Sequence, residues 1–151
     1  MIYFDNASTG FFKPRSVIDA VNTVINHLSV NPTRSGHRLA LSGAEIISQA
    51  RSTIAEYFDG SYEKVIFTKN CTEALNTAIF GCVKKGGHVL TTAFEHNSVL
   101  RPLSHLKKQG VIDFDIAFPK PDESLDITLS SMIKPNTYMI IANAVSNVTG
   151  Q

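Results

Sequence analysis

The 151-residue sequence lacks the features that direct a chain to a membrane, a nucleic acid or an export pathway. It has no run of about 18 apolar residues, so we expect no transmembrane helix. The formal net charge is only +1 and the basic residues are scattered, so no positive field favours nucleic acid or an anionic membrane surface. The first residues, MIYFDNAS, include the acid Asp5 and no basic stretch, unlike a signal peptide. We therefore predict a cytoplasmic location.

The sequence is also poor in side chains spaced to bind a metal ion. Its two cysteines, Cys71 and Cys82, are too few for a disulfide framework and do not form a Cys-x-x-Cys pair. The five histidines form no HExxH pattern or similar ligand set. We expect both cysteines to be reduced thiols, and we assign no metal site.

Two helices are predicted in the first part of the chain. Apolar residues recur at helical spacing over residues 15–28 and again over residues 43–58. Ser42 and Glu45 form a plausible capping box at the start of the second helix. A polar loop at residues 29–38, with turn-forming proline and glycine, separates the two helices.

The pattern changes near residue 60, where short apolar strands begin to alternate with helices. Strands are expected at residues 64–68, 88–93, 112–118 and 137–145, and helices at 70–83, 97–109 and 127–133. The last strand is almost entirely apolar, which is typical of a strand buried on both faces. Alternation of this kind indicates a mostly parallel sheet in a three-layer α/β/α fold. We therefore divide the chain into residues 1–60, a loop and helical segment, and residues 61–151, a sheet-containing region.

Polar residues follow three of the predicted strands, at the sheet edge where ligands bind in open parallel sheets. They occupy residues 69–73, 95–97 and 146–147. The first group turns directly from strand to helix, and the free N–H groups of a helix start, with its positive dipole end, make an anion site. Thr72 adds a hydroxyl donor, although an ordinary capped helix explains the same pattern. The sequence has neither GxxxxGK[ST] nor GxGxxG there, which disfavours a P-loop or dinucleotide site.

Several polar loop residues allow both a structural and a functional interpretation. His96 can simply tether its loop, or it can stack on an aromatic ring and transfer a proton. Asn147 can be a turn residue, or an amide donor facing a ligand. Arg34 can bind a carboxylate, or it can belong to a solvated linker. For Cys71 we favour the role of a small loop residue.

Six stretches of the sequence, in order along the whole chain, resemble the class V aminotransferase family in its cysteine desulfurase-like branch. They are YFDNAST with KPRSVIDAV, NPTRSGHRLA, AEIISQAR, VIFTKNCTEALN, KKGGHVLTTAFEHNSVLRPL and ANAVSNVTG. One stretch would be weakly specific, whereas six in order are strongly specific. The resemblance implies a homodimeric, pyridoxal 5′-phosphate (PLP)-dependent enzyme of fold type I that acts on a small amino acid. Residues 61–151 would then be the first part of its PLP-binding large domain.

The resemblance also implies a role for individual residues. Cys71 and Thr72 match the positions whose backbone and hydroxyl hold the PLP phosphate. His96 matches the histidine that stacks on the pyridine ring and is our candidate catalytic residue, and Asn147 matches an asparagine near the cofactor's phenolic oxygen. Segments near the mouth of the family's active site supply candidate substrate-binding residues, namely Asn6, Ala7, Arg34 and His37.

Other groups that the family needs come later in its chains than Gln151. They are the aspartate paired with the pyridine nitrogen, the Schiff-base lysine that usually follows a histidine, and the persulfide-forming cysteine. This sequence has no His-Lys dipeptide, and neither of its cysteines aligns with the catalytic one. We therefore expect an N-terminal fragment of a PLP-dependent cysteine desulfurase-like enzyme, with weak or absent PLP binding. The alternative is a non-catalytic truncated relative that acts through interaction.

The resemblance further predicts an unpaired strand. The three later strands are neighbours in the family sheet, whereas the strand at residues 65–68 lies beyond strands that come later in family chains. We expect this segment to expose unpaired backbone and apolar side chains, which is costly. Our hypothesis is that the 151 residues alone are not a stable copy of the family fold.

Overall fold

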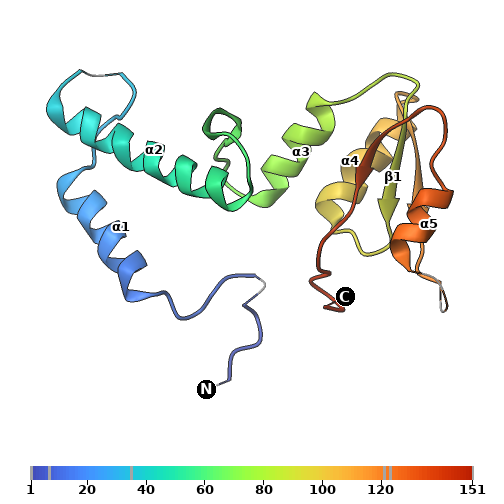
Figure 1. Cartoon of the computed structure of the whole chain (residues 1–151), viewed down its shortest axis with the longest axis horizontal. Coiled ribbons are helices and arrows are strands. Elements are labelled where there is room, and N and C mark those ends of the chain that lie inside the picture. The colour runs from blue at the N-terminus through green and yellow to red at the C-terminus, as the bar shows by residue number, and fades with distance from the viewer. Residues whose placement is uncertain (1, 7, 35, 121, 123, 151) are drawn as a thin grey trace. The chain divides into compact units, whose positions relative to one another are not determined.

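The computed structural model of the chain describes residues 2–6, 8–34, 36–120, 122 and 124–150. The backbone separates into two compact units, which we call the N-terminal unit (Met1–Phe67) and the C-terminal unit (Thr68–Gln151). Figure 1 shows helices in both units and the strands in the second. Among the described helices, none is long and apolar enough to cross a membrane.

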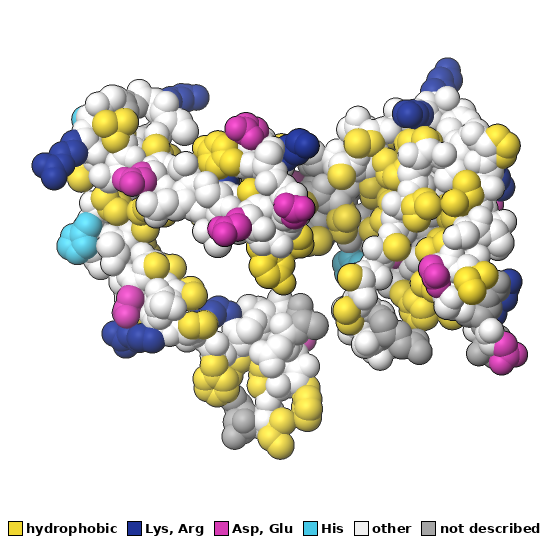
Figure 2. Space-filling model, in the orientation of Figure 1, with side chains coloured by type: hydrophobic (Ala, Val, Ile, Leu, Met, Phe, Trp, Pro, Cys, Tyr) yellow, Lys and Arg dark blue, Asp and Glu magenta, His cyan; other side chains and the backbone are white. Residues whose placement is uncertain are grey.

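The N-terminal unit consists of helices α1 (Arg15–His27) and α2 (Arg38–Tyr57), with a 3₁₀ turn, η1, at Tyr62–Lys64. The predicted first helix is confirmed. None of the α1 residues is buried, although its apolar stripe follows helical spacing. The large side chains of this stripe are between 37% and 63% exposed. They are Val17, Ile18, Val21, Val24 and Ile25. Hydrophobic side chains are visible over much of the surface in Figure 2.

Helix α2 begins five residues earlier than predicted. Its N-cap is His37, whose Nδ1 accepts a hydrogen bond from the Ala40 amide at 3.2 Å. The predicted capping box at Ser42 and Glu45 is therefore wrong, because Ser42 lies inside the helix and its Oγ donates to the Arg38 carbonyl at 3.3 Å. The intervening residues are good helix formers, so they extend the helix back to the next residue able to cap it.

The segment at residues 65–68 does not form the predicted strand. Val65 has extended backbone angles, but the side chains of Ile66 and Phe67 are 77% and 51% exposed. An extended segment becomes a β-strand only when a neighbouring strand takes up its hydrogen bonds, and the described sheet contains only the three later strands. The expected exposure of apolar side chains is confirmed.

The C-terminal unit is built on three parallel strands in the order β2-β1-β3. They are β1 (His88–Thr92), β2 (Asp113–Ala117) and β3 (Thr137–Ile141). The connecting helices are α3 (Cys71–Gly81), α4 (Asn97–Lys108) and α5 (Leu125–Ser131). Figure 1 shows α4 and α5 on opposite sides of β1, so the predicted layered α/β fold with a parallel sheet is confirmed.

We predicted that the last strand, β3, is buried on both faces. The structure shows such burial for β1 instead. All five residues of β1 are buried because this strand is central, whereas β3 is only half-buried and its Ile140 is 48% exposed. In the described sheet, β3 has a hydrogen-bonded neighbour on one side only. The apolar composition of a strand favours burial, but the neighbouring strands and helices decide whether burial is reached.

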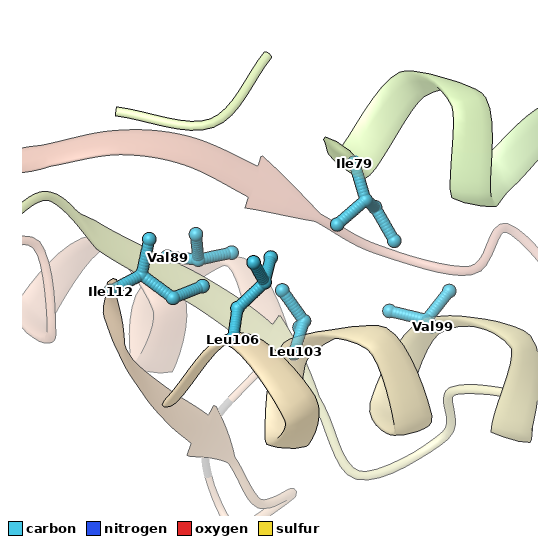
Figure 3. Packing of buried hydrophobic residues seen from close by; sticks show 6 residues of the cluster. All are labelled: Ile79, Val89, Val99, Leu103, Leu106 and Ile112. Atoms are coloured by element: carbon cyan, nitrogen blue, oxygen red, sulfur yellow. The ribbon is translucent and has the colours of Figure 1, made fainter. Parts of the chain in front are cut away.

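The core of the C-terminal unit lies between the sheet and the pair α3 and α4. Figure 3 shows six buried side chains that point toward one another: Ile79, Val89, Val99, Leu103, Leu106 and Ile112. Pro102 lies within α4 without ending it. Because proline has no N–H, the Ser98 carbonyl loses its usual partner one turn earlier. The Asn76 side chain of α3 approaches that carbonyl, with Nδ2 at 3.4 Å, and so links the two helices.

A polar cluster joins the three strands near their amino ends. His88, only 1% exposed, places Nδ1 2.8 Å from Oγ1 of Thr137 and Nε2 3.3 Å from Oδ2 of Asp115. The second contact is a close approach without hydrogen-bonding geometry. Lys134 places Nζ 2.6 Å from the same Asp115 oxygen. The cluster therefore connects β1 to both of its neighbours.

We expect this cluster to make the C-terminal unit sensitive to acid. The hydrogen bond from Lys134 holds the pKa of Asp115 below its ordinary value of 3.8. The stabilisation is therefore complete above that ordinary value and is lost as the pH falls through the lower pKa of the folded state. Urea unfolding from about pH 7 to about pH 2 should show the stability difference between wild type and Asp115→Asn shrinking below about pH 4. The exposed carboxylate of Asp122 gives the control, and Asp122→Asn should run parallel to wild type throughout.

Candidate functional site

The start of α3 is fixed by side-chain caps on both sides. Asn70 is the N-cap, and its Oδ1 accepts a hydrogen bond from the Glu73 amide at 2.9 Å. The Glu73 carboxylate accepts from the Lys69 amide at 2.7 Å, one residue before the cap. The amides of Cys71 and Thr72 precede the first backbone hydrogen bond of the helix, so they belong to the donors that a helix start leaves for a ligand or water. Both residues are exposed.

His96 occupies the equivalent position at the start of α4. Its Nδ1 accepts a hydrogen bond from the Ser98 amide at 3.1 Å and lies 2.8 Å from the Ser98 hydroxyl. Because Nδ1 accepts from the backbone, a neutral ring carries its proton on Nε2. The imidazole is thus oriented by its own helix while the residue stays exposed.

A cleft of about 400 Å³ brings Thr72 and His96 together. It runs between α3 and α4, and its other lining residues are Asn76, Phe80, Asn97, Ser98, Arg101, Pro102 and His105. Asn76 lies one turn after Thr72, and its Nδ2 donates to the Thr72 carbonyl at 2.8 Å. Asn76 was not among the predicted site residues, although its i, i+4 spacing from Thr72 places both on one face of the helix.

The other predicted site residues that the structure describes are not among those that line this cleft. Cys71 stands at the start of α3, and Asn147 lies exposed in the turn after β3. The buried Ser146 forms that turn by accepting hydrogen bonds at its Oγ from the amides of Val148 and Thr149.

The candidate substrate-binding residues belong to the N-terminal unit. Asn6 is exposed and holds its own loop, where its Oδ1 accepts from the Phe11 amide at 3.3 Å. Arg34 is exposed beside the turn formed by Asn31, and His37 caps α2. Ala7 lies outside the described residues. A role for any of these residues in a binding site stays a prediction.

The chain segments that follow β1 and β3 are joined directly. Glu95, between β1 and α4, accepts hydrogen bonds at Oε1 from the Thr92 hydroxyl at 2.7 Å and from the Asn143 amide at 2.6 Å. Glu95 therefore ties the segment after β3 to the end of β1, through Asn143 and not through the predicted residues 146–147. The sequence placed Glu95 at this edge, but its two partners could be identified only in three dimensions.

The profile of the Aminotransferase class-V family matches residues 2–151. The chain belongs to this family. It is 28% identical over 153 residues to a probable cysteine desulfurase of Pyrococcus abyssi, covering 99% of this chain and 38% of that protein. It is 32% identical over 157 residues to cysteine desulfurase IscS 1 of Archaeoglobus fulgidus, covering 99% and 40%. This class-V aminotransferase chain thus corresponds to the N-terminal portion of these relatives and spans about two fifths of their length.

Solved structures agree with this assignment. The apo cysteine desulfurase from Thermococcus onnurineus NA1 superposes with a TM-score of 0.84 at 26% identity, covering 97% of this chain and 37% of that one. SspA in complex with cysteine gives 0.80 at 27% identity, covering 96% and 42%. A third structure, C-DES with glycine covalently linked to its PLP cofactor, supports the fold at 18% identity and a TM-score of 0.74. Members of the class-V aminotransferase family are PLP-dependent.

Proposed function

We propose that residues 68–150 form one side of a PLP site, in a protein that removes sulfur from cysteine. The observation that carries the proposal is the cleft in which the start of α3 and the start of α4 place Thr72 and His96 together. Its volume of about 400 Å³ falls within the range typical of small-molecule sites. The cysteine desulfurase relatives and the cysteine in the SspA complex support cysteine as substrate. We further propose a cytoplasmic homodimer.

The donor set at α3 fits the phosphate of PLP. A dianionic phosphate is stabilised by the positive end of the helix dipole and by the amides of Cys71 and Thr72. The Thr72 hydroxyl can donate one further hydrogen bond to a phosphate oxygen. The hydrogen bonds of Asn70 and Glu73 hold this turn in place before any ligand arrives.

His96 fits the aromatic ring of the cofactor. Its imidazole is flat, exposed and oriented through Nδ1, so Nε2 is the atom that would hold or release a proton. Asn147 would donate from its amide toward the phenolic oxygen of the cofactor. When bound, PLP supplies an electron sink for the amino-acid substrate. The alternative, an interaction module without activity of its own, would need none of these groups.

The decisive test of the cofactor site is PLP binding by Thr72→Val, which removes the hydroxyl and keeps the side-chain shape. A hydrogen bond to a charged group contributes about 1.5–3 kcal/mol, so the dissociation constant should rise roughly tenfold to a hundredfold. Fluorescence titration with PLP measures it, and pyridoxal, which has no phosphate, should show no such difference. Thr77→Val is the matched control, because Thr77 is an exposed threonine of the same helix outside the cleft.

Equal PLP affinity in Thr72→Val and Thr77→Val would rule out the phosphate assignment. The activity is tested separately, by reading the gene beyond codon 151 and assaying any longer product for release of alanine and sulfide from cysteine. PLP binding without either product would redirect the proposal to an aminotransferase or another lyase of the family.

A further inference from the structure

The structure assigns to Glu95 the role of a positioning residue, which holds the segment after β3 (residues 142–147) against the loop that carries His96. The inference rests on the proposed function in one respect, because Asn147 and His96 are residues of the proposed PLP site. The hydrogen bonds themselves do not depend on that function. Glu95 is half-buried, so solvent competes only partly for its carboxylate.

The hydroxyl of Thr92 is committed to Glu95. Thr92 is 1% exposed at the end of β1, and its Oγ1 accepts from the Phe94 amide at 3.3 Å. Its single proton therefore remains for donation, and it points to Oε1 of Glu95 at 2.7 Å. This arrangement fixes the carboxylate with respect to the central strand of the sheet.

The same carboxylate oxygen receives the Asn143 amide at 2.6 Å, a short and charge-assisted contact. Asn143 is the second residue after β3, and the Thr91 hydroxyl of β1 donates to the Ile141 carbonyl at 3.0 Å. In the described sheet, β3 pairs with β1 alone. These two side-chain contacts, one from β1 and one from the loop after it, therefore direct the chain as it leaves β3, four residues before Asn147.

Three substitutions of Glu95 distinguish a positioning role from a requirement for its negative charge. Glu95→Ala removes the acceptor for both donors. Glu95→Gln keeps an Oε1 acceptor at the same reach without the charge, so it should restore the position of the segment. Glu95→Asp keeps the charge but is one methylene shorter, so it should restore little.

The readout is hydrogen exchange of the Asn143 amide in the whole chain without cofactor. Glu95→Ala should accelerate this exchange about tenfold or more, because the acceptor of the Asn143 amide is lost. Glu95→Gln should remain within about threefold of wild type and should restore the resonances of the Asn147 side-chain amide and the His96 ring. Slow exchange at Val89 and Leu90, both fully buried, verifies that each variant is folded. If Glu95→Ala does not fold, Thr92→Val gives the same comparison against Thr92→Ser, which keeps the hydroxyl.

Unchanged Asn143 exchange in a folded Glu95→Ala variant would overturn the inference. It would be overturned equally if Glu95→Gln behaved like Glu95→Ala, because charge and not position would then be the requirement. PLP titration is kept apart from this test. Equal PLP affinity in Thr72→Val and Thr77→Val contradicts the proposed cofactor site, whereas the exchange data alone decide the role of Glu95.

Discussion

Replacing Leu103 by alanine is expected to lower the free energy of unfolding of the C-terminal unit by about 2–5 kcal/mol. Leu103 is fully buried on α4, in the cluster with Val89 of β1 and Ile79 of α3 (Figure 3). The loss combines the transfer of the side chain from water with the cavity left in packing that relaxes only partly. Whole domains are stable by only roughly 5–15 kcal/mol, so the substitution should remove a large share of the stability of the unit.

The matched control for this prediction is Leu100→Ala on the same helix. Leu100 is half-buried and outside the core cluster, so the same atoms are lost with little cavity. We expect a loss below about 1 kcal/mol, offset in part by the higher helix propensity of alanine. Urea unfolding followed by circular dichroism measures both variants. Similar losses would show that α4 does not present Leu103 to the core.

The elements of the C-terminal unit could be predicted from sequence because each carries its own local signal. The run HVLTT is bounded by a glycine turn, and Asn70 with Glu73 marks the start of α3 at the correct residue. Helices between strands also fix parallel pairing, because a crossover returns the chain to the same end of the sheet. These features depend on neighbours close in sequence or on topology that few alternatives satisfy.

The predictions that failed depend on partners rather than on local pattern. VIFT has strand composition, yet residues 65–68 have no strand beside them among the described residues. The apolar run of β3 favours burial, yet burial requires a neighbour on each side. Ser42 and Glu45 satisfy the spacing of a capping box. The preceding residues RLAL also form helix, however, so the N-cap is His37.

The candidate site likewise has features that the sequence could predict and features that it could not. The proximity of Thr72 and His96 could be expected, since each was predicted to follow a strand at the same sheet edge. In the structure residues 65–68 are not in the sheet, and the packing of α3 on α4 brings the two residues together. The contribution of Asn76 depends on the missing N–H of Pro102 in another helix, and that of Glu95 depends on the Asn143 amide 48 residues away. No short motif records such contacts, because they arise only when the elements pack.

Replacing Gly87 by alanine is expected to disrupt the pairing of β1 with β3 and to cost about 1–3 kcal/mol. Gly87 precedes β1 and is buried. A Cβ at this position would lie 2.5 Å from the Tyr138 ring and 2.8 Å from the Lys84 carbonyl oxygen. The ring could rotate away, but the carbonyl belongs to the turn in which the Gly87 amide itself donates to Lys84 at 2.9 Å. Relief of the clash must therefore move backbone.

The register between β1 and β3 explains why the ring of Tyr138 lies beside Gly87. His88 pairs with Thr137 and Val89 pairs with Met139, so Tyr138 is the extra residue of an irregularity in β3. The ring packs against the backbone of Gly87, and Nζ of Lys84 lies 5.7 Å from its centroid. Alanine at position 87 would displace Tyr138 at this irregularity. It would thereby weaken the pairing of β3 with β1, which is the only strand pair of β3 in the described sheet.

Gly81→Ala gives the matched comparison for Gly87→Ala. Gly81 is the last residue of α3 and a Cβ there would meet no atom within 4 Å, so alanine should be neutral or stabilising by up to about 1 kcal/mol. The changes in the free energy of unfolding of the two variants, measured with urea, should therefore differ in sign. In a double-mutant cycle, Tyr138→Ala should recover part of the loss in Gly87→Ala, because it removes one of the two clashes. Strictly additive losses, or equal stability of the two glycine variants, would show that the ring does not pack on Gly87 in solution.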